Sequence, residues 1–368
     1  LRRARRREPA LAVRLLAWAA AAALAAGGTV AVGSALDASW LFLFTAAAVW
    51  TVAFASVGLL NGLGRQVSLC QASFMGVGAL VAARVGSSCA GGAATGQVCA
   101  SVDSPARAWL APVAAMVVAG LVGVLVAAGA TRVRGVMLAV ATLSFGFFLD
   151  NTIFPAREIS GGEFGFPMQR PTGFTSPVAF WVLCAALALG AVLVVRNLGR
   201  SATGRVMRGI EQSPQAVAAF GIRPAAYKLA TFGVSAAMAG LAGYLYGALL
   251  GSFTGGNYST FLSLFLFVVV SMIGTHAATG PVVTAAFYVL VPKLLNSVGG
   301  EAGDANSIYA LGALVTLSLP GGVLGWLSLR RAAARSQARG ADDLAPPAWL
   351  LEDGPAARRS PRDLVGRG

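Results

Sequence analysis

The sequence predicts an all-α, polytopic membrane protein with about ten transmembrane helices. Of its 368 residues, 57% are hydrophobic and 11% are charged, whereas a soluble domain carries roughly 25% charged residues. Several apolar runs reach the ~20 residues that a helix needs to cross a bilayer. The net charge of +14 at pH 7 does not indicate nucleic-acid binding, because the positive charges gather at the chain ends and in connecting loops.

The apolar runs divide most of the chain into ten predicted spans: 11–33, 41–60, 67–86, 108–129, 136–154, 177–195, 229–250, 260–278, 281–299 and 307–327. They form a transmembrane domain over 11–327, between a basic segment at 1–10 and an Arg-, Pro- and Ala-rich tail at 328–368. The tail cannot bury enough apolar surface to order itself, so we expect it to be disordered and to contact anionic lipid.

The distribution of Arg and Lys predicts the orientation of the spans, because cytoplasmic loops carry an excess of these residues. Loop 196–228 contains six of them and one acid, Glu211. The loops at 87–107 and 155–176 together contain three. We therefore predict that loop 196–228 and both termini are cytoplasmic and that the other two loops are outside. The apolar start of the chain also has features of a signal peptide, which would leave the later topology unchanged.

Loop 196–228 is too long for a tight turn, and we expect a short helix around 205–220. Its helix signals are Pro214 in a first turn, Glu211 or Ser213 as N-cap, and Gly221 at the end. A basic, helical loop of this kind is a candidate docking surface. The alternative is a loop that binds only lipid headgroups.

Two segments, 61–79 and 274–284, mix glycine and polar residues with apolar ones. Non-helical backbone at membrane depth survives only where protein buries it or water reaches it. These segments are therefore candidates for broken helices beside a pathway, and the alternative is tight packing of small residues. The spacing of Gly243, Gly247 and Gly251 likewise predicts a close helix contact, within the chain or between subunits.

The four cysteines fall into two pairs. Cys89 and Cys99 lie in a predicted outer loop, where an oxidising exterior permits a disulfide, although two free thiols are equally compatible with the sequence. Cys70 and Cys184 lie in predicted spans, where we expect them to act as small packing residues.

The sequence indicates neither an enzyme nor a cofactor or metal site. His276 is the only histidine, so a metal site or a hydrolytic triad cannot be assembled convincingly. A phosphate-binding loop needs Gly before Lys, but Tyr227 precedes Lys228 and Pro292 precedes Lys293. Lys293 lies within a predicted span, where it either reaches toward the outer interface or takes part in a functional ion pair.

Several motifs occur in a specific order: Val67-Ser-Leu-Cys-Gln-Ala-Ser-Phe-Met-Gly-Val-Gly-Ala79, Arg134-Gly-Val-Met-Leu-Ala139, Thr142-Leu-Ser-Phe-Gly146, Ser160-Gly-Gly-Glu-Phe-Gly165, Arg208-Gly-Ile-Glu-Gln-Ser213, Ala218-Ala-Phe-Gly-Ile222 and Phe232-Gly-Val-Ser-Ala-Ala-Met-Ala-Gly-Leu-Ala-Gly243. Together they resemble branched-chain amino acid ABC importer permeases of the LivM type over roughly residues 58–327.

This resemblance implies an ABC importer permease architecture in a bacterial inner (plasma) membrane. It implies an ATP-driven importer for branched-chain or related amino acids. The expected partners are a homologous, LivH-like second permease, two cytoplasmic ABC ATPases and an extracytoplasmic solute-binding protein. Alternatives are a permease of the same superfamily for urea, amides or sugars, or an ion-coupled secondary carrier.

The resemblance also implies two sets of site residues. The expected ATPase-coupling residues are Arg205, Arg208, Glu211, Ala218 and Gly221. The expected substrate path is lined by Ser68, Gln71, Phe74, Thr142, Phe145 and Gly280. A mostly apolar path suits a hydrophobic amino acid that a binding protein delivers.

Overall fold

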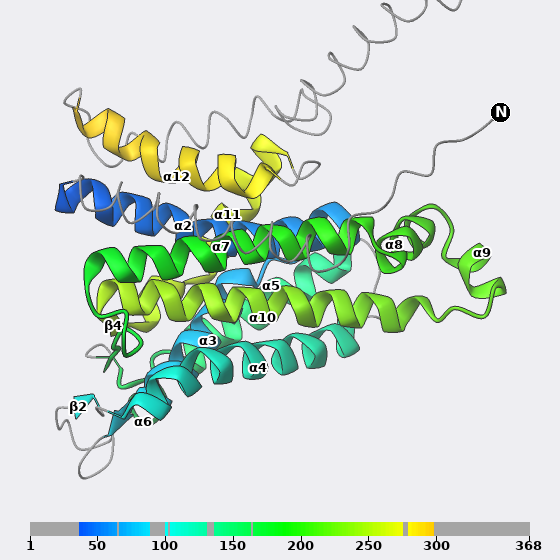
Figure 1. Cartoon of the computed structure of the whole chain (residues 1–368). Helices are drawn as coiled ribbons and strands as arrows, with labels where there is room; N and C mark the ends of the chain where they lie inside the picture. The colour runs from blue at the N-terminus through cyan, green and yellow to red at the C-terminus, as the bar shows by residue number, and fades with distance from the viewer. Residues whose placement is uncertain are drawn as a thin grey trace, which may run out of the picture.

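The computed structural model describes residues 37–64, 66–88, 100–101, 104–130, 136–162, 165–274 and 279–297. These residues form a helical bundle with two very short β-ribbons, as Figure 1 shows. The main helices are α2 (Ala38–Leu59), α3 (Gln71–Gly86), α4 (Pro105–Ala130), α5 (Val136–Phe148), α7 (Pro177–Arg200), α10 (Pro224–Leu250), α11 (Thr260–Ile273) and α12 (Gly280–Ser297). The predicted all-α class is thus confirmed.

Shorter elements connect these helices. They are the helices α6 (Arg157–Ser160), α8 (Ala202–Gln212) and α9 (Pro214–Ala219), the π-helical turns η1 (Leu60–Gly64) and η3 (Leu149–Ile153), the 3₁₀ turn η4 (Gly255–Tyr258), and the strands β1 (Ser87–Ser88), β2 (Ala100–Ser101), β3 (Phe166–Pro167) and β4 (Ser252–Phe253). β1 pairs antiparallel with β2, and β3 with β4, with Phe166 opposite Phe253.

Within the described residues, five helices are long and apolar enough to cross a membrane: Ala38–Gly64, Pro105–Gly129, Pro177–Arg200, Pro224–Leu250 and Gly255–Ile273. Two shorter apolar helices cover Met137–Ile153 and Gly280–Leu295. The chain is therefore a multi-pass membrane protein, but the count of ten spans is not confirmed. The predicted spans 11–33 and 307–327 lie outside the described residues.

The connecting elements gather at the two ends of the bundle. The ribbons and α6 lie at one end, and α8 and α9 project from the other (Figure 1). We call these the ribbon end and the elbow end, and we define the elbow as residues 202–221. The described parts of loops 87–107 and 155–176 thus lie at one end, and loop 196–228 lies at the other.

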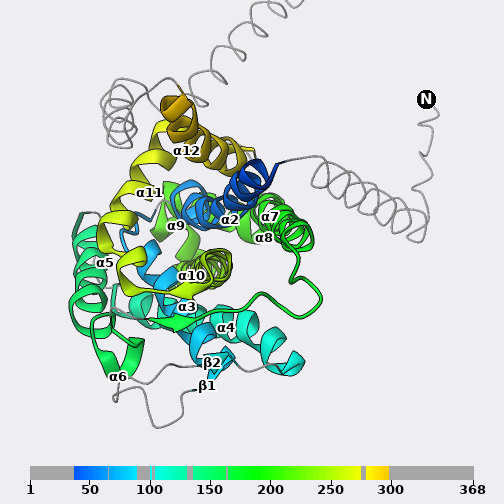
Figure 2. The same cartoon turned by 90° about the vertical axis from the view of Figure 1, so that its left-hand side faces the viewer.

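Helix α10 lies at the centre of the bundle, beside α2, α3 and α4 (Figure 2). Small residues allow this close packing. The predicted glycine ridge is a contact within the chain: a Cβ on Gly243 would overlap the main chain of Met75, and a Cβ on Gly247 would overlap Met168. Gly251 instead ends α10, with a φ of 80° that favours glycine.

The described residues show the first predicted break and part of the second. After α2 the chain forms the π-helical turn η1 and then an irregular link at 66–70, so α3 begins only at Gln71. This helix has 16 residues and is shorter than the predicted span 67–86. The second break follows α11, where Gly274 has a φ of 103°, and α12 begins at Gly280.

Several expectations fall on residues that the structure does not describe. Cys89, Cys99 and His276 are among them, as are the segments 1–10 and 328–368. Cys70 and Cys184 are described, and both are free thiols buried in the bundle. This location confirms the prediction that these two cysteines are packing residues.

Candidate functional site

The elbow consists of two helices rather than the single helix expected around 205–220. Ser213 has an extended backbone, with a φ of −154°, and separates α8 from α9. Its hydroxyl accepts a hydrogen bond from the Ala216 N–H at 3.2 Å, and Pro214 follows it in the first turn. Ser213 is therefore the N-cap and Glu211 is not, because Glu211 lies within α8. Gly221, with a φ of 77°, follows α9 as predicted.

One face of α8 anchors the elbow to the bundle. Gly204, Met207 and Ile210 are buried at a spacing of three residues, which places them on one side of the helix. A Cβ on Gly204 would overlap the Leu198 carbonyl oxygen at the end of α7. The Thr231 hydroxyl of α10 lies 3.7 Å from the Met207 sulfur. The elbow is thus packed against both α7 and α10.

Two arginines fasten α8 to the last turn of α7. Arg208 Nη1 donates to the Gly199 carbonyl at 2.9 Å, and Arg205 Nη1 donates to the Arg200 carbonyl at 3.4 Å. The last carbonyls of a helix lack intrahelical partners and carry partial negative charge, so cations are favourable there. Both side chains are exposed, and each guanidinium has further N–H groups for a partner.

Phe220 is a prominent elbow residue that the sequence interpretation did not select. It follows α9 directly, and its side chain is 85% exposed. The other candidate residues of this loop, Ala218, Gly221 and Glu211, are exposed as well. A large apolar side chain in a basic, non-spanning loop was the available signal. It makes the tip of the elbow a partly apolar surface with positive charge nearby.

The elbow also touches the first break in the bundle. A Cβ on Gly64, in η1, would stand 3.7 Å from Met207 Cε and 3.7 Å from the Gln66 amide nitrogen. Single π-helical turns are frequent at functional sites. Here η1 leads through link 66–70 into α3. A movement of α8 would therefore act directly on the segment that carries Ser68, Gln71 and Phe74, three of the six candidate path residues.

Gln71, at the start of α3, joins three helices. Its side-chain amide donates to Ser235 Oγ of α10 at 2.6 Å and to Ser56 Oγ of α2 at 3.2 Å. Ser235 Oγ in turn donates to the Ser56 carbonyl at 2.7 Å. Gln71 is 1% exposed, and its Oε1 has no hydrogen-bond partner among the described residues. Ser56 and Ser235 were not predicted, although each is a polar residue within an apolar helix.

Neighbouring helices also satisfy the first main-chain donors near the start of α3. The Leu69 N–H donates to Thr142 Oγ1 of α5 at 3.1 Å, and the Ala72 N–H donates to Ser263 Oγ of α11 at 2.9 Å. Ser68 Oγ lies 3.5 Å from Cys70 Sγ. Because the first N–H groups of a helix have no partner within it, these side chains hold the break in a defined geometry.

Aromatic rings continue this cluster along α3. The Phe74 ring centroid lies 5.9 Å from that of Phe145 and 5.9 Å from that of Phe232, the latter in an edge-to-face arrangement. Five of the six predicted path residues therefore lie within or beside the first half of α3 and the link that precedes it. They are Ser68, Gln71, Phe74, Thr142 and Phe145. The sixth, Gly280, lies beside α2, where it lines a separate cavity with Gly58 and Thr284.

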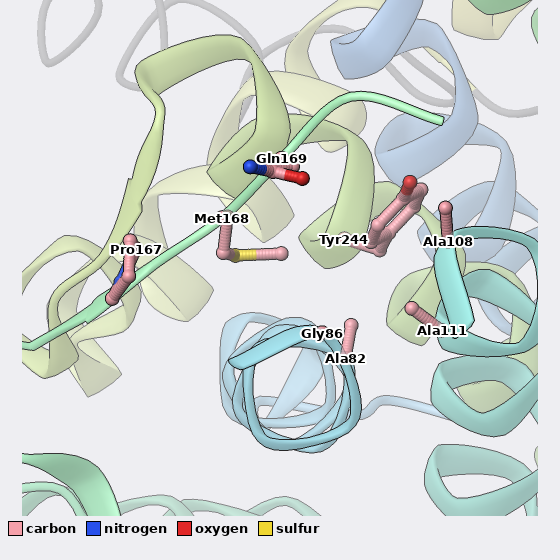
Figure 3. Close-up of a pocket in the computed structure, with 8 residues that line it drawn as sticks. All are labelled: Ala82, Gly86, Ala108, Ala111, Pro167, Met168, Gln169 and Tyr244. Atoms are coloured by element: carbon pink, nitrogen blue, oxygen red, sulfur yellow. The ribbon is translucent and has the colours of Figure 1, made fainter. Parts of the chain in front are cut away.

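Two cavities lined by described residues are small. The cavity at Gly280 measures about 10 Å³. The second measures about 20 Å³ and is lined by Ala82, Gly86, Ala108, Ala111, Pro167, Met168, Gln169 and Tyr244 (Figure 3). Each has room for about one water molecule, so neither can hold an amino acid. The bundle is therefore closed at both cavities.

Lys293 rests on an aromatic ring at the ribbon end. Its Nζ lies 5.6 Å from the centroid of Trp40, near the start of α2. A cation over an indole ring is stabilised by the ring quadrupole. The contact supports a lysine that reaches toward the bundle end. Among the described residues, no group of three His, Cys, Asp or Glu side chains could hold a metal ion.

Comparison with known proteins adds one match. The sequence profile of the family described as "Branched-chain amino acid transport system / permease component" matches residues 39–319. The match covers most of the chain and includes every coupling and path residue discussed above. No curated protein and no solved structure matches the chain.

Proposed function

The chain belongs to the family of branched-chain amino acid transport permease components, and on this premise we propose that it is the membrane subunit of an ATP-driven importer. Its substrates are branched-chain or related amino acids. Separate cytoplasmic ATPases hydrolyse ATP and dock on the elbow. A second, homologous permease and an extracytoplasmic binding protein complete the assembly in a bacterial inner membrane. Both termini and the elbow face the cytoplasm.

The observation that carries this proposal is the contact of the elbow with η1. Met207 on the buried face of α8 lies against Gly64, and η1 continues into the start of α3. The opposite side of the elbow is exposed and carries Arg205, Arg208 and Phe220. The elbow thus connects an exposed surface that is available to a partner with the break near the candidate path.

This arrangement supports a mechanism for coupling. Closure of the two ATPases tilts the elbow, and α8 displaces η1 and link 66–70 because they are packed together. The hydrogen bond between Leu69 and Thr142 and the one between Gln71 and Ser235 then break, and these groups bond to other partners. Each such bond contributes only about 0.5–1.5 kcal/mol, so a bundle held in this way can switch between two arrangements.

The side chains around α3 support a hydrophobic substrate. Phe74 and Phe145 provide apolar surface, and Gln71 and Thr142 provide a few polar groups. Such a lining suits an apolar side chain better than a sugar, which needs many hydrogen bonds. Selection among similar amino acids then resides mainly in the binding protein.

The test is uptake by the assembled importer in proteoliposomes, with ATP inside and the binding protein outside. We expect accumulation of radiolabelled leucine that requires ATP, both ATPases and the binding protein. Unlabelled valine should compete, whereas urea, acetamide and glucose should not. Uptake by the chain alone without nucleotide would instead identify a secondary carrier, and competition by urea or glucose alone would assign one of the other substrate classes.

A further inference from the structure

Two buried hydroxyl groups, from α3 and α11, both lie against Gly146 of α5. Ser73 of α3 is 1% exposed and Thr260 of α11 is 0% exposed. Neither Ser73 Oγ nor Thr260 Oγ1 has a hydrogen-bond partner among the described residues. A Cβ on Gly146 of α5 would stand 3.1 Å from the first and 3.2 Å from the second. Buried polar groups are normally paired, so these two hydroxyl groups are available as hydrogen-bond donors to a ligand.

The same place is the N-terminus of a long helix. Thr260 is the first residue of α11, which has 14 residues. The N-terminal end of a helix presents free N–H groups and partial positive charge, and it therefore favours an anion. The Ser259 hydroxyl accepts from the Leu262 N–H at 3.4 Å. The Thr260 N–H has no acceptor within α11, so it can donate a hydrogen bond to a group from outside the helix.

A carboxylate already occupies that position. Asp150 Oδ2 accepts a hydrogen bond from the Thr260 N–H at 3.1 Å. Asp150 lies in the π-helical turn η3 that follows α5, and such turns are often found where a segment rearranges for function. The half-buried Asp150 side chain thus serves as an internal anion at the end of α11.

We propose that the N-terminus of α11, together with the hydroxyls of Thr260 and Ser73, is a binding site for the carboxylate group of the substrate. Asp150 occupies the site while the bundle is closed and leaves when substrate enters. This inference rests on the proposed function, because it assigns one group of an amino acid. The bundle must open to admit the rest of the amino acid, and the incoming carboxylate then takes the place of a group of the same chemistry.

The donors define what the site selects. The Thr260 N–H, the Thr260 hydroxyl and the Ser73 hydroxyl are neutral, and the helix end supplies the positive potential. A carboxylate offers several lone pairs to such donors. Urea, amides and sugars carry no negative charge, so they gain less from the helix end and displace Asp150 poorly. The site therefore distinguishes amino acids from the other substrate classes of the family.

The test measures binding of L-leucine, labelled with ¹³C at its carboxyl carbon, to the full-length chain in lipid nanodiscs by NMR. L-leucinol is the matched ligand, because it has an alcohol in place of the carboxylate. Asp150→Asn keeps an acceptor of equal size but removes the competing charge, so leucine should bind about tenfold more tightly. Thr260→Val removes one hydroxyl at nearly constant volume, so leucine should bind about tenfold more weakly.

Thr45→Val is the control for the second variant. Thr45 is also a buried threonine, and its hydroxyl donates to the Leu41 carbonyl of its own helix at 2.7 Å. Leucine affinity should not change in this variant. The proposal is overturned if leucine binds neither the wild type nor Asp150→Asn, if leucinol binds as tightly as leucine, or if Thr260→Val has no larger effect than Thr45→Val.

The outcome is separable from that of the proposed function. ATP-driven leucine uptake that is unchanged in Asp150→Asn and Thr260→Val would support the importer and overturn this site. Conversely, carboxylate binding with the expected response to both variants, but without ATP-driven uptake by the assembly, would support the site and overturn the importer.

Discussion

Gly243 of α10 lies directly against the main-chain carbonyl group of Met75 in α3, with no space for a side chain between them. Gly78 of α3 and Gly240 of α10 form a second contact of the same kind. The two backbones therefore touch. Membrane helices associate through such small residues, because the hydrophobic effect does not drive apolar surfaces together within lipid.

Replacement of Gly243 by Ala should separate α3 from α10. The added Cβ would overlap the Met75 carbonyl oxygen, and the rigid backbone cannot move aside cheaply. Forced overpacking of this kind costs about 1–3 kcal/mol. Thermal unfolding in detergent should show a lower midpoint for Gly243→Ala. The matched control is Gly190→Ala in α7, because nothing lies within 4 Å of a Cβ at that position. Equal midpoints in the two variants would contradict the contact.

The sequence predicted features that depend on local chemistry. The break at 61–79 could be predicted because its glycine and polar residues are unfavourable in an apolar span. Residue type and spacing also predicted the close packing of Gly243 and an N-cap at either Glu211 or Ser213. In each case the feature depends on an interaction between residues that are close in the sequence, or only on the presence of a small side chain.

Features that depend on distant partners could not be predicted. The residues at 205–220 favour a helix, so the sequence predicted one continuous helix there. In the folded loop, the extended backbone of Ser213 divides this helix into two. Nothing in the sequence pairs Gln71 with Ser235, because 164 residues separate them and only the packed bundle selects the partner. The contact of Asp150 with Thr260 has the same origin.

Replacement of Ser235 by Ala should loosen the junction of α2, α3 and α10. The Ser235 hydroxyl accepts from Gln71 and donates to the Ser56 carbonyl, and all three groups are buried. Loss of a buried partner costs about 1–3 kcal/mol, so the unfolding midpoint in detergent should fall. Ser271→Ala is the control, because the Ser271 hydroxyl is exposed and bonds within its own helix. A midpoint for Ser235→Ala that equals that of Ser271→Ala would argue against the junction.

Charge reversal on the elbow should uncouple transport from ATP hydrolysis. Arg208→Glu places a negative charge beside the Gly199 carbonyl and removes a cation from the exposed surface, and Glu211→Lys reverses a neighbouring charge. In the proposed complex the docked ATPase buries these charges, and loss of one partner of a buried, hydrogen-bonded charge pair costs about 2–5 kcal/mol, so coupled uptake should fall at least about tenfold. Membrane insertion should be unchanged.

Co-purification with the ATPase subunits gives a direct measure of docking for these two variants. Arg107→Glu is the matched control, because Arg107 is an exposed arginine near the start of α4, at the ribbon end. It should retain the ATPases, whereas Arg208→Glu and Glu211→Lys should lose them. If both elbow variants bound the ATPases as the wild type does, the elbow would not be the docking surface.

Replacement of Arg84 by Lys should release α6 from the end of α3. Arg84 donates to the Ile159 carbonyl from Nε at 3.0 Å and from Nη2 at 2.8 Å, and its guanidinium lies 4.7 Å from the centre of the Phe166 ring. Lysine cannot reproduce this forked, planar geometry, so hydrogen exchange over 157–162 should become roughly tenfold faster. Arg170→Lys is the control, because Arg170 holds the separate segment at Thr175 through one bond of 3.1 Å. It should speed exchange near Thr175 and leave 157–162 unchanged. Identical exchange profiles for the two variants would show that Arg84 does not hold α6 in place.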